Sequence, residues 1–168
     1  MVVDRLLVLY FDSYCMRTRE IIIEILRNTR NIQIDRYTHQ LCEDITCENK
    51  EIRRVGVKFL KRLKCVVNDE NVLLCARKVD RKAYLSILKN NINIANQVYR
   101  DGVVKGALPN FTVKEHVKIA KINFYVQSLL IRKIRQEGDS ELVRQLKERI
   151  PVLSDEVDNA IKRMRKSR

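Results

Sequence analysis

Residues 106–116, GALPNFTVKEH, contain the clearest turn in a chain of 168 residues that has only four glycines and two prolines. Proline lacks the backbone N–H that a helix interior needs, so Pro109 separates the elements on either side of it. Thr112 and Glu115 have the spacing of a capping box, in which each side chain accepts a hydrogen bond from the other residue's backbone N–H. We therefore expect a new helix to begin at Thr112.

The two segments that flank this turn have the apolar spacing of long helices. Before the turn, apolar residues recur at spacings of three, four and seven over 72–99, and we expect Gly102 to end that helix in a left-handed conformation. After the turn, a run without glycine or proline predicts a helix over 112–137, which Gly138 ends. These segments are the two long central helices that we expect.

Most of the remaining sequence is also helical in pattern, and a polar stretch at 28–50 predicts a loop or short helical turns. The fold class is therefore all-α, a bundle of about five to seven helices. We expect a helical domain over 1–138 and a helical C-terminal extension with a basic tail over 139–168. The other expected helices are 2–30 with a break near Met16 and a cap at Thr18, 50–67 with Asn68 or Asp69 capping the next helix, 140–149, and 154–165 after Pro151.

The composition is typical of a globular protein that binds a polyanionic partner. Hydrophobic residues make up 45% and charged residues 33%, and the formal net charge is +13. A positive charge this large favours polyanions such as DNA or RNA. No apolar stretch reaches the roughly 18 residues of a membrane span, and the first residues lack the features of a signal peptide, so we expect an intracellular protein without a membrane partner.

Three basic segments indicate how such a partner would be bound. Residues 50–64 carry seven Lys or Arg, residues 77–82 carry four, and residues 162–168 carry five. One cluster alone is typical of a solvated helix face, but three favour contact with phosphates, without a motif that reads bases. The predicted nucleic-acid-binding residues are Arg53, Arg54, Lys58, Lys61, Arg62, Arg77, Lys78, Arg81 and Lys82.

The helix expected over 112–137 carries an apolar stripe that is wider than one core face requires. One line consists of Val113, Val117, Ala120 and Phe124, which we expect to pack on the helix over 72–99. A second line, rotated around the axis, either meets a partner protein or is covered by the N- and C-terminal helices of the same chain. The residues of this predicted partner interface are Ile119, Ile122, Val126, Leu130 and Ile134.

We predict no enzymatic activity, no cofactor and no metal site. His39, Cys42 and Cys47 have the spacing H-x2-C-x4-C, whereas structural zinc sites usually have paired ligands two to five residues apart. The sequence has no phosphate-binding glycine loop, and the five cysteines lie in no setting typical of a nucleophile. The cysteines form no regular framework, so we expect free thiols.

Residues 70–135 resemble the helical domain of the GINS complex, and the nearest subunit is the first of its partner-of-Sld-five subunits. VLLCARKVDRKAYLSIL at 72–88 is similar to a family helix that leads to a Leu-Pro-Asn turn, here GALPN at 106–110, and then to another long helix. TREIIIEILRN at 18–28 is similar to an early helix of that subunit. The family normally continues into a small β-rich domain, whereas 139–168 is helical in pattern here.

Two functions are therefore expected, from different classes. The resemblance implies a non-enzymatic helical subunit of a nuclear DNA replication complex, in contact with other protein subunits and, through the basic segments, with the nucleic-acid backbone. The alternative is a small basic factor bound in the cytoplasm to ribosomal or other structured RNA. In both cases we expect contact with the backbone to be independent of base sequence.

Overall fold

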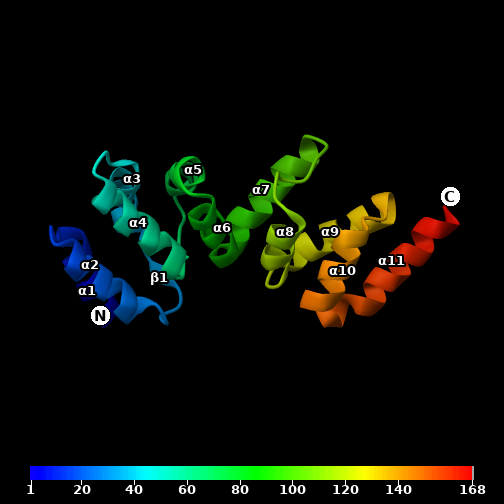
Figure 1. Cartoon of the computed structure of the whole chain (residues 1–168), viewed down its shortest axis with the longest axis horizontal. Helices are drawn as coiled ribbons and strands as arrows, with labels where there is room; N and C mark the ends of the chain where they lie inside the picture. Colours follow the sequence, from blue (N-terminus) through cyan, green and yellow to red (C-terminus); the bar gives the residue numbers. More distant parts are fainter. Residues whose placement is uncertain (168) are drawn as a thin grey trace. The chain divides into compact units, whose positions relative to one another are not determined.

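The computed structural model describes residues 1–167, and over these residues the chain forms eleven α-helices (Figure 1). The only strands in this part are β1 (Ile32–Gln33) and β2 (Cys65–Val66), which pair in parallel. The all-α class is confirmed, although the helices are shorter and more numerous than expected. The chain divides into two compact units, Met1–Asn91 and Ile92–Arg168, and not at residue 138.

The first unit contains six α-helices, one 3-10 turn at Asp35–Tyr37 and the strand pair. The expected break near Met16 lies at residues 13–15, and Thr18 is inside a helix, so the prediction that Thr18 caps it was wrong. The polar stretch contains short helical turns and also one full helix. The helices are α1 (Val2–Asp12), α2 (Met16–Leu26), α3 (Thr38–Thr46), α4 (Lys50–Arg62), α5 (Glu70–Val79) and α6 (Arg81–Asn90).

An aromatic cluster and one buried ion pair lie in the core of the first unit. The ring centroid of Tyr10 lies 4.8 Å from that of Phe11 and 4.7 Å from that of Phe59. The buried guanidinium of Arg19 donates to Asp44 Oδ2 at 2.8 Å and to the carbonyl oxygen of Ser13 at 2.9 Å. A buried guanidinium is costly unless its N–H groups have acceptors. The ion pair between Arg19 and Asp44 therefore holds α2 and α3 together.

The prediction of one long helix over 72–99 was wrong, because single polar residues divide this segment into shorter helices. Asp80 is extended, at φ −152° and ψ 115°, and its side chain accepts from the N–H of Ala83 at 2.8 Å, which begins α6. Asn91 ends α6, and its buried amide accepts from the N–H of Val67 and donates to the carbonyl oxygens of Cys65 and Ile87. Asp and Asn side chains make such local bonds in competition with a continuous helix.

The second unit contains five α-helices and a 3-10 turn at Pro151–Leu153. The prediction of one helix over 112–137 was also wrong, because Asn123 interrupts it. The side-chain oxygen of Asn123 accepts from the N–H of Val126 at 3.1 Å and begins a second helix. Gly138 ends the second of the two resulting helices at φ 66°, as predicted. The helices are α7 (Ile92–Val104), α8 (Val113–Ala120), α9 (Phe124–Glu137), α10 (Ser140–Arg149) and α11 (Ser154–Lys166).

The turn at 106–116 has the predicted capping box. The N–H of Glu115 donates to Thr112 Oγ1 at 3.3 Å, and the N–H of Thr112 donates to Glu115 Oε2 at 2.8 Å. Gly102 is not the left-handed residue, since it lies inside α7 and Gly106 has the positive φ of 81°. Gly102 is instead a point of close approach, because a Cβ there would lie 2.6 Å from the carbonyl oxygen of Ala107.

Candidate nucleic-acid interface

Helix α4 carries the first basic segment, and its two faces have different surroundings. Asn49 caps the helix by accepting from the N–H groups of Glu51 and Ile52. Val55 and Phe59 are fully buried on one side, where α4 packs on α2, α3 and α6. The basic residues follow at spacings of three and four along the opposite side, so they share one surface of the helix.

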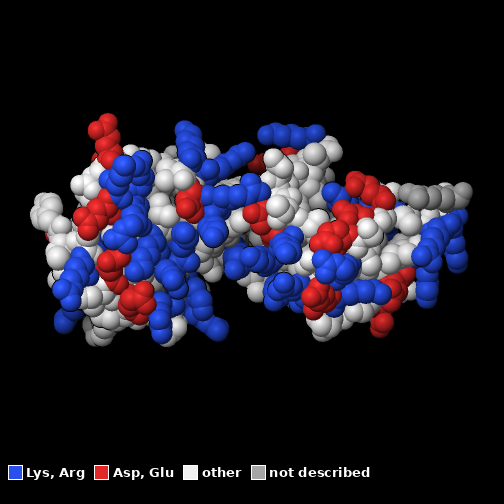
Figure 2. All heavy atoms as spheres, in the orientation of Figure 1, with Lys and Arg blue, Asp and Glu red and all other residues white. Residues whose placement is uncertain are grey.

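This basic side of α4 borders an open hollow of about 520 Å³ in the first unit. Val57 from α4, Val79 from α5 and the corner residue Asp80 complete its lining. Figure 2 shows Lys and Arg side chains gathered over the part of the first unit where Figure 1 draws α4. The cationic lining residues are Lys50, Arg53, Arg54, Lys58, Lys61 and Arg62.

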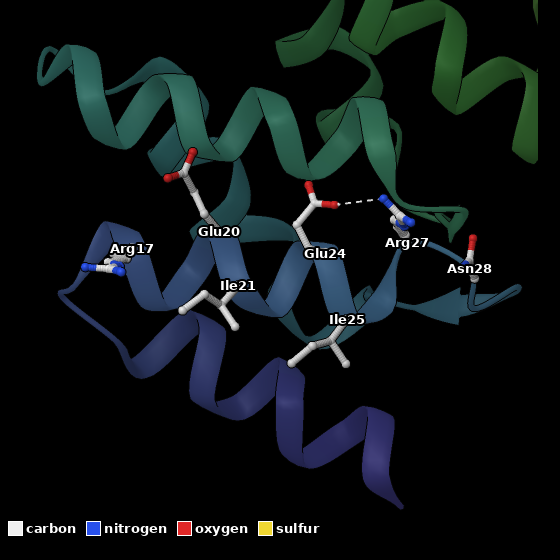
Figure 3. Close-up of a pocket in the computed structure, with 7 residues that line it drawn as sticks. All are labelled: Arg17, Glu20, Ile21, Glu24, Ile25, Arg27 and Asn28. Carbon is white, nitrogen blue, oxygen red and sulfur yellow. Dashed lines mark hydrogen bonds and ion pairs between the residues drawn. The ribbon is translucent and has the colours of Figure 1, made fainter.

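Two acidic residues of α2 hold two of these cations in place. Glu20 Oε1 lies 2.8 Å from Arg54 Nη1 and 3.4 Å from Lys58 Nζ, and Glu24 lies 3.7 Å from Lys58 Nζ. The hydrogen bond from Arg54 lowers the pKa of Glu20, which keeps this carboxylate ionised. In Figure 3, Glu20 and Glu24 extend from α2 toward α4, whereas Ile21 and Ile25 of the same helix point away from it.

The other cations of the hollow have their charges available for a ligand. Lys50, Arg53, Lys61 and Arg62 form no ion pair with any residue of the described part of the chain. Of the predicted residues on α4, Arg53 is half-buried and Lys61 and Arg62 are exposed. The α4 side therefore combines two cations fixed by ion pairs with four that have no acidic partner.

The second predicted cluster lies on both sides of the Asp80 corner. Arg77 and Lys78 are in the last turn of α5, and Arg81 and Lys82 begin α6. All four are exposed. Val79 and Asp80, the residues between the two pairs, line the α4 hollow, so the structure brings the second cluster to the edge of the first.

Sequence reasoning did not single out Lys50 or Asp80 for this site. Lys50 lies three residues before Arg53, a spacing that places both on one helix face, and this was the signal available. Asp80 enters the lining only because the chain turns sharply there, which the apolar spacing did not indicate. The third basic segment is exposed on α11 at Lys162, Arg163, Arg165 and Lys166, while Arg168 lies outside the described residues.

The residues of the rejected metal site lie on or next to α3. His39 is exposed, and its Nδ1 lies 3.6 Å from Glu43 Oε1. Cys42 contacts the thiol of Cys75 on α5, and burial together with that contact raises the pKa of Cys42 to about 12. Among residues 1–167, no three His, Cys, Asp or Glu side chains are grouped so that they would hold a metal ion.

The predicted partner interface is largely interior. Ile119, Val126, Leu130 and Ile134 are each at most 1% exposed, and α11 packs on α9, so the expectation that this line meets a partner was wrong for these four residues. Only Ile122, in the link between α8 and α9, is exposed, at 54%. The alternative gave this cover to the N- and C-terminal helices of the chain, and the packing of α11 on α9 provides the C-terminal part of it.

The first apolar line of this segment also differs from its prediction. Val117 and Ala120 are buried, but α8 packs chiefly on α9 and α10, whereas the prediction placed this line on the helix over 72–99, and Phe124 is 83% exposed. The reason is that Asn123 starts a new helix, so the residues after it no longer continue the face of α8. The direction of Phe124 is therefore set by the break and not by the spacing.

In the comparisons with known proteins, no family model, no curated protein and no solved structure matches this chain. Within residues 1–167, no helix is both long enough and apolar enough to cross a membrane.

Proposed function

We propose that the chain is a non-enzymatic protein that binds the phosphate backbone of a nucleic acid through the basic side of α4, independently of base sequence. The observation that carries this proposal is the arrangement of six Lys and Arg side chains around one open hollow, four of them without an acidic partner in the described residues. Cations gathered on one face neutralise neighbouring phosphates and release their counterions, which drives association.

The chemistry of the hollow supports backbone contact over recognition of bases. Its lining consists of Lys, Arg, Val and Asp side chains and includes no aromatic ring. Proteins that hold single strands usually stack bases on aromatic side chains, so this lining fits the regularly spaced phosphates of a double helix better. Glu20 and Glu24 stabilise Arg54 and Lys58 in position before any ligand arrives, which reduces the entropy lost on binding.

The resemblance to GINS extends this proposal to a place in a replication complex with other protein subunits, and this stays a prediction. The alternative, a factor bound to structured RNA, uses the same cations, because phosphates are common to both polymers. Duplex DNA and duplex RNA of equal length distinguish the two, since the major groove of A-form RNA is deep and narrow.

The test reverses the cations that lack ion pairs and leaves the α2–α4 contacts intact. In the triple variant Arg53→Glu, Lys61→Glu, Arg62→Glu, we expect weaker binding of a fluorescent duplex. We also expect the slope of log K against log salt to fall by about 0.9 for each DNA phosphate that the variant no longer neutralises. The parent should bind duplexes of unrelated sequence with equal affinity.

A matched control changes the net charge by the same amount in the second unit. Lys105→Glu, Lys118→Glu, Arg135→Glu alters three exposed residues that do not line the hollow. If this control weakens binding as much as the α4 variant does, net charge and not the α4 hollow is responsible, and the proposed site is wrong. Circular dichroism of each variant checks that the helices are retained.

A further inference from the structure

A second hollow, of about 550 Å³, lies within the second unit, and the turn at 106–111 forms one wall of it. Residues of α9 between Leu129 and Glu137 and the residue His116 of α8 also line it.

His116 is a polar group that the fold buries but uses only in part. It is 6% exposed, and its Nδ1 lies 2.7 Å from the hydroxyl oxygen of Tyr99. Burial, with a smaller effect of Lys133, lowers the pKa of His116 to about 4, so the imidazole is neutral at pH 7. A tyrosine hydroxyl that donates to Nδ1 leaves the single ring proton on Nε2.

In the tautomer in which the Tyr99 hydroxyl donates to Nδ1, the Nε2–H of His116 is the unused donor of this ring. Nε2 has no hydrogen-bond partner among the described residues. It is not fully enclosed either, so it is accessible from the hollow that the ring lines. Phe111 and Tyr99 contact the ring edge-on, at centroid distances of 5.5 Å and 5.6 Å, and fix its orientation. In this tautomer the hollow therefore presents a neutral N–H donor.

The charged groups of the hollow add one cation to this donor. Lys133 Nζ lies 3.7 Å from Glu137 Oε2, which offsets its charge, whereas Arg132 is exposed and has no ion pair within residues 1–167. One unpaired guanidinium and one neutral N–H that line the same hollow suit a group with a single negative charge and two acceptor oxygens, which is a carboxylate. A phosphate dianion would find too little positive charge here.

The apolar lining determines what the carboxylate is attached to. Leu108, Pro109, Phe111 and Leu129 are each half-buried and present apolar surface to the hollow. The volume exceeds that of a single small acid and fits a segment of two or three residues. We propose that this hollow binds an acidic–apolar peptide segment of a partner protein, with an Asp or Glu carboxylate accepting from Arg132 and His116 Nε2–H and an apolar neighbour against Leu108 and Phe111.

This site is separate in residues and in ligand from the α4 surface, so either proposal stands without the other. The probes are three tripeptides, acetylated and amidated at their ends, in which Asp lies between two Leu, two Val or two Phe residues. The readout is the 15N resonance of the imidazole nitrogens. The chain has two histidines, and exposed His39 of the first unit is the internal reference.

We expect at least one Asp peptide to shift the His116 resonances with a dissociation constant on the order of 1 mM, as for a ligand of this size with few contacts. The matched Asn peptide, and the Asp peptide with the Arg132→Gln variant, should each bind about tenfold more weakly. The His39 resonances should not move.

Three results would overturn the proposal. One is the absence of any His116 shift with all three Asp peptides, in protein whose amide spectrum shows a folded second unit. Another is an equal shift with the Asn peptides, which would show that the carboxylate is not recognised. The last is a saturable shift with inorganic phosphate or a short duplex but with no Asp peptide, which would assign the hollow to phosphates.

Discussion

Acid should destabilise the second unit through His116 by an amount that follows from its burial. The folded pKa is about 4 and the ordinary value is 6.5. A histidine whose folded pKa is depressed contributes stability that is complete above about pH 6.5 and is lost as the pH falls toward about pH 4, because the unfolded state takes up the proton first. At about pH 4.5 this linkage removes about 2.5 kcal/mol of unfolding free energy relative to pH 7.

The assay must separate His116 from the many carboxylates that titrate in the same range. Urea unfolding, followed by helicity and by amide exchange in α9, is measured at about pH 7 and about pH 4.5 for the parent and for His116→Asn. Asn keeps an acceptor for the Tyr99 hydroxyl but does not titrate. The parent should lose about 2.5 kcal/mol more than the variant. Equal losses would refute the reasoning, since the buried imidazole would then have no part in the acid response.

Three further predictions concern contacts described above. Asp44→Ala should lower the unfolding free energy by about 3–5 kcal/mol in urea unfolding, because Arg19 stays buried without its partner. Burial already raises the pKa of Asp44 despite the charge of Arg19, so replacing both Arg19 and Asp44 with apolar residues should cost much less. Cys15 should react first with iodoacetamide in a mass-spectrometric time course, because a hydrogen bond with the Thr18 side chain lowers its exposed thiol's pKa. Cys65 should react only after unfolding, because burial raises its pKa to about 12. Gly102→Ala should lower the thermal midpoint and cost about 1–3 kcal/mol, because the added methyl meets the carbonyl oxygen of Ala107 and one backbone must move. Unchanged stability of either variant, or early labelling of Cys65, would contradict these contacts.

Several helix boundaries were predictable from the capping box, the glycines and the apolar faces. The capping box at Thr112, the end at Gly138 and the two last helices agree with the pattern. The breaks at Asp80, Asn91 and Asn123 were missed, because one polar residue serves as the boundary and the apolar spacing continues across it. At Asp80 and at Asn123 both helices bury residues within one unit, so the spacing alone does not reveal the turn.

The candidate site was predictable as a helix face but not as a place in the fold. The spacing of Arg53, Lys58 and Lys61 was enough to put them on one side of α4. The partners of Arg54 and Lys58 were not predictable, since Glu20 and Glu24 are more than 25 residues away and reach α4 only through the packing of α2. The width of the stripe on α9 was predicted correctly, but its cover by α11 depends on a tertiary contact.

The corner at Asp80 has a consequence for how the chain tolerates changes in length. This single residue closes α5 through its N–H bond to the carbonyl oxygen of Ala76 and opens α6 through its side chain, so no spare linker separates the two helices. Insertion of one residue before Asp80 would turn everything after it by about 100° about the α5 axis, since a helix has 3.6 residues per turn. Arg81 and Lys82 would then be displaced relative to Arg77 and Lys78, so we expect the chain not to accept insertions at this corner.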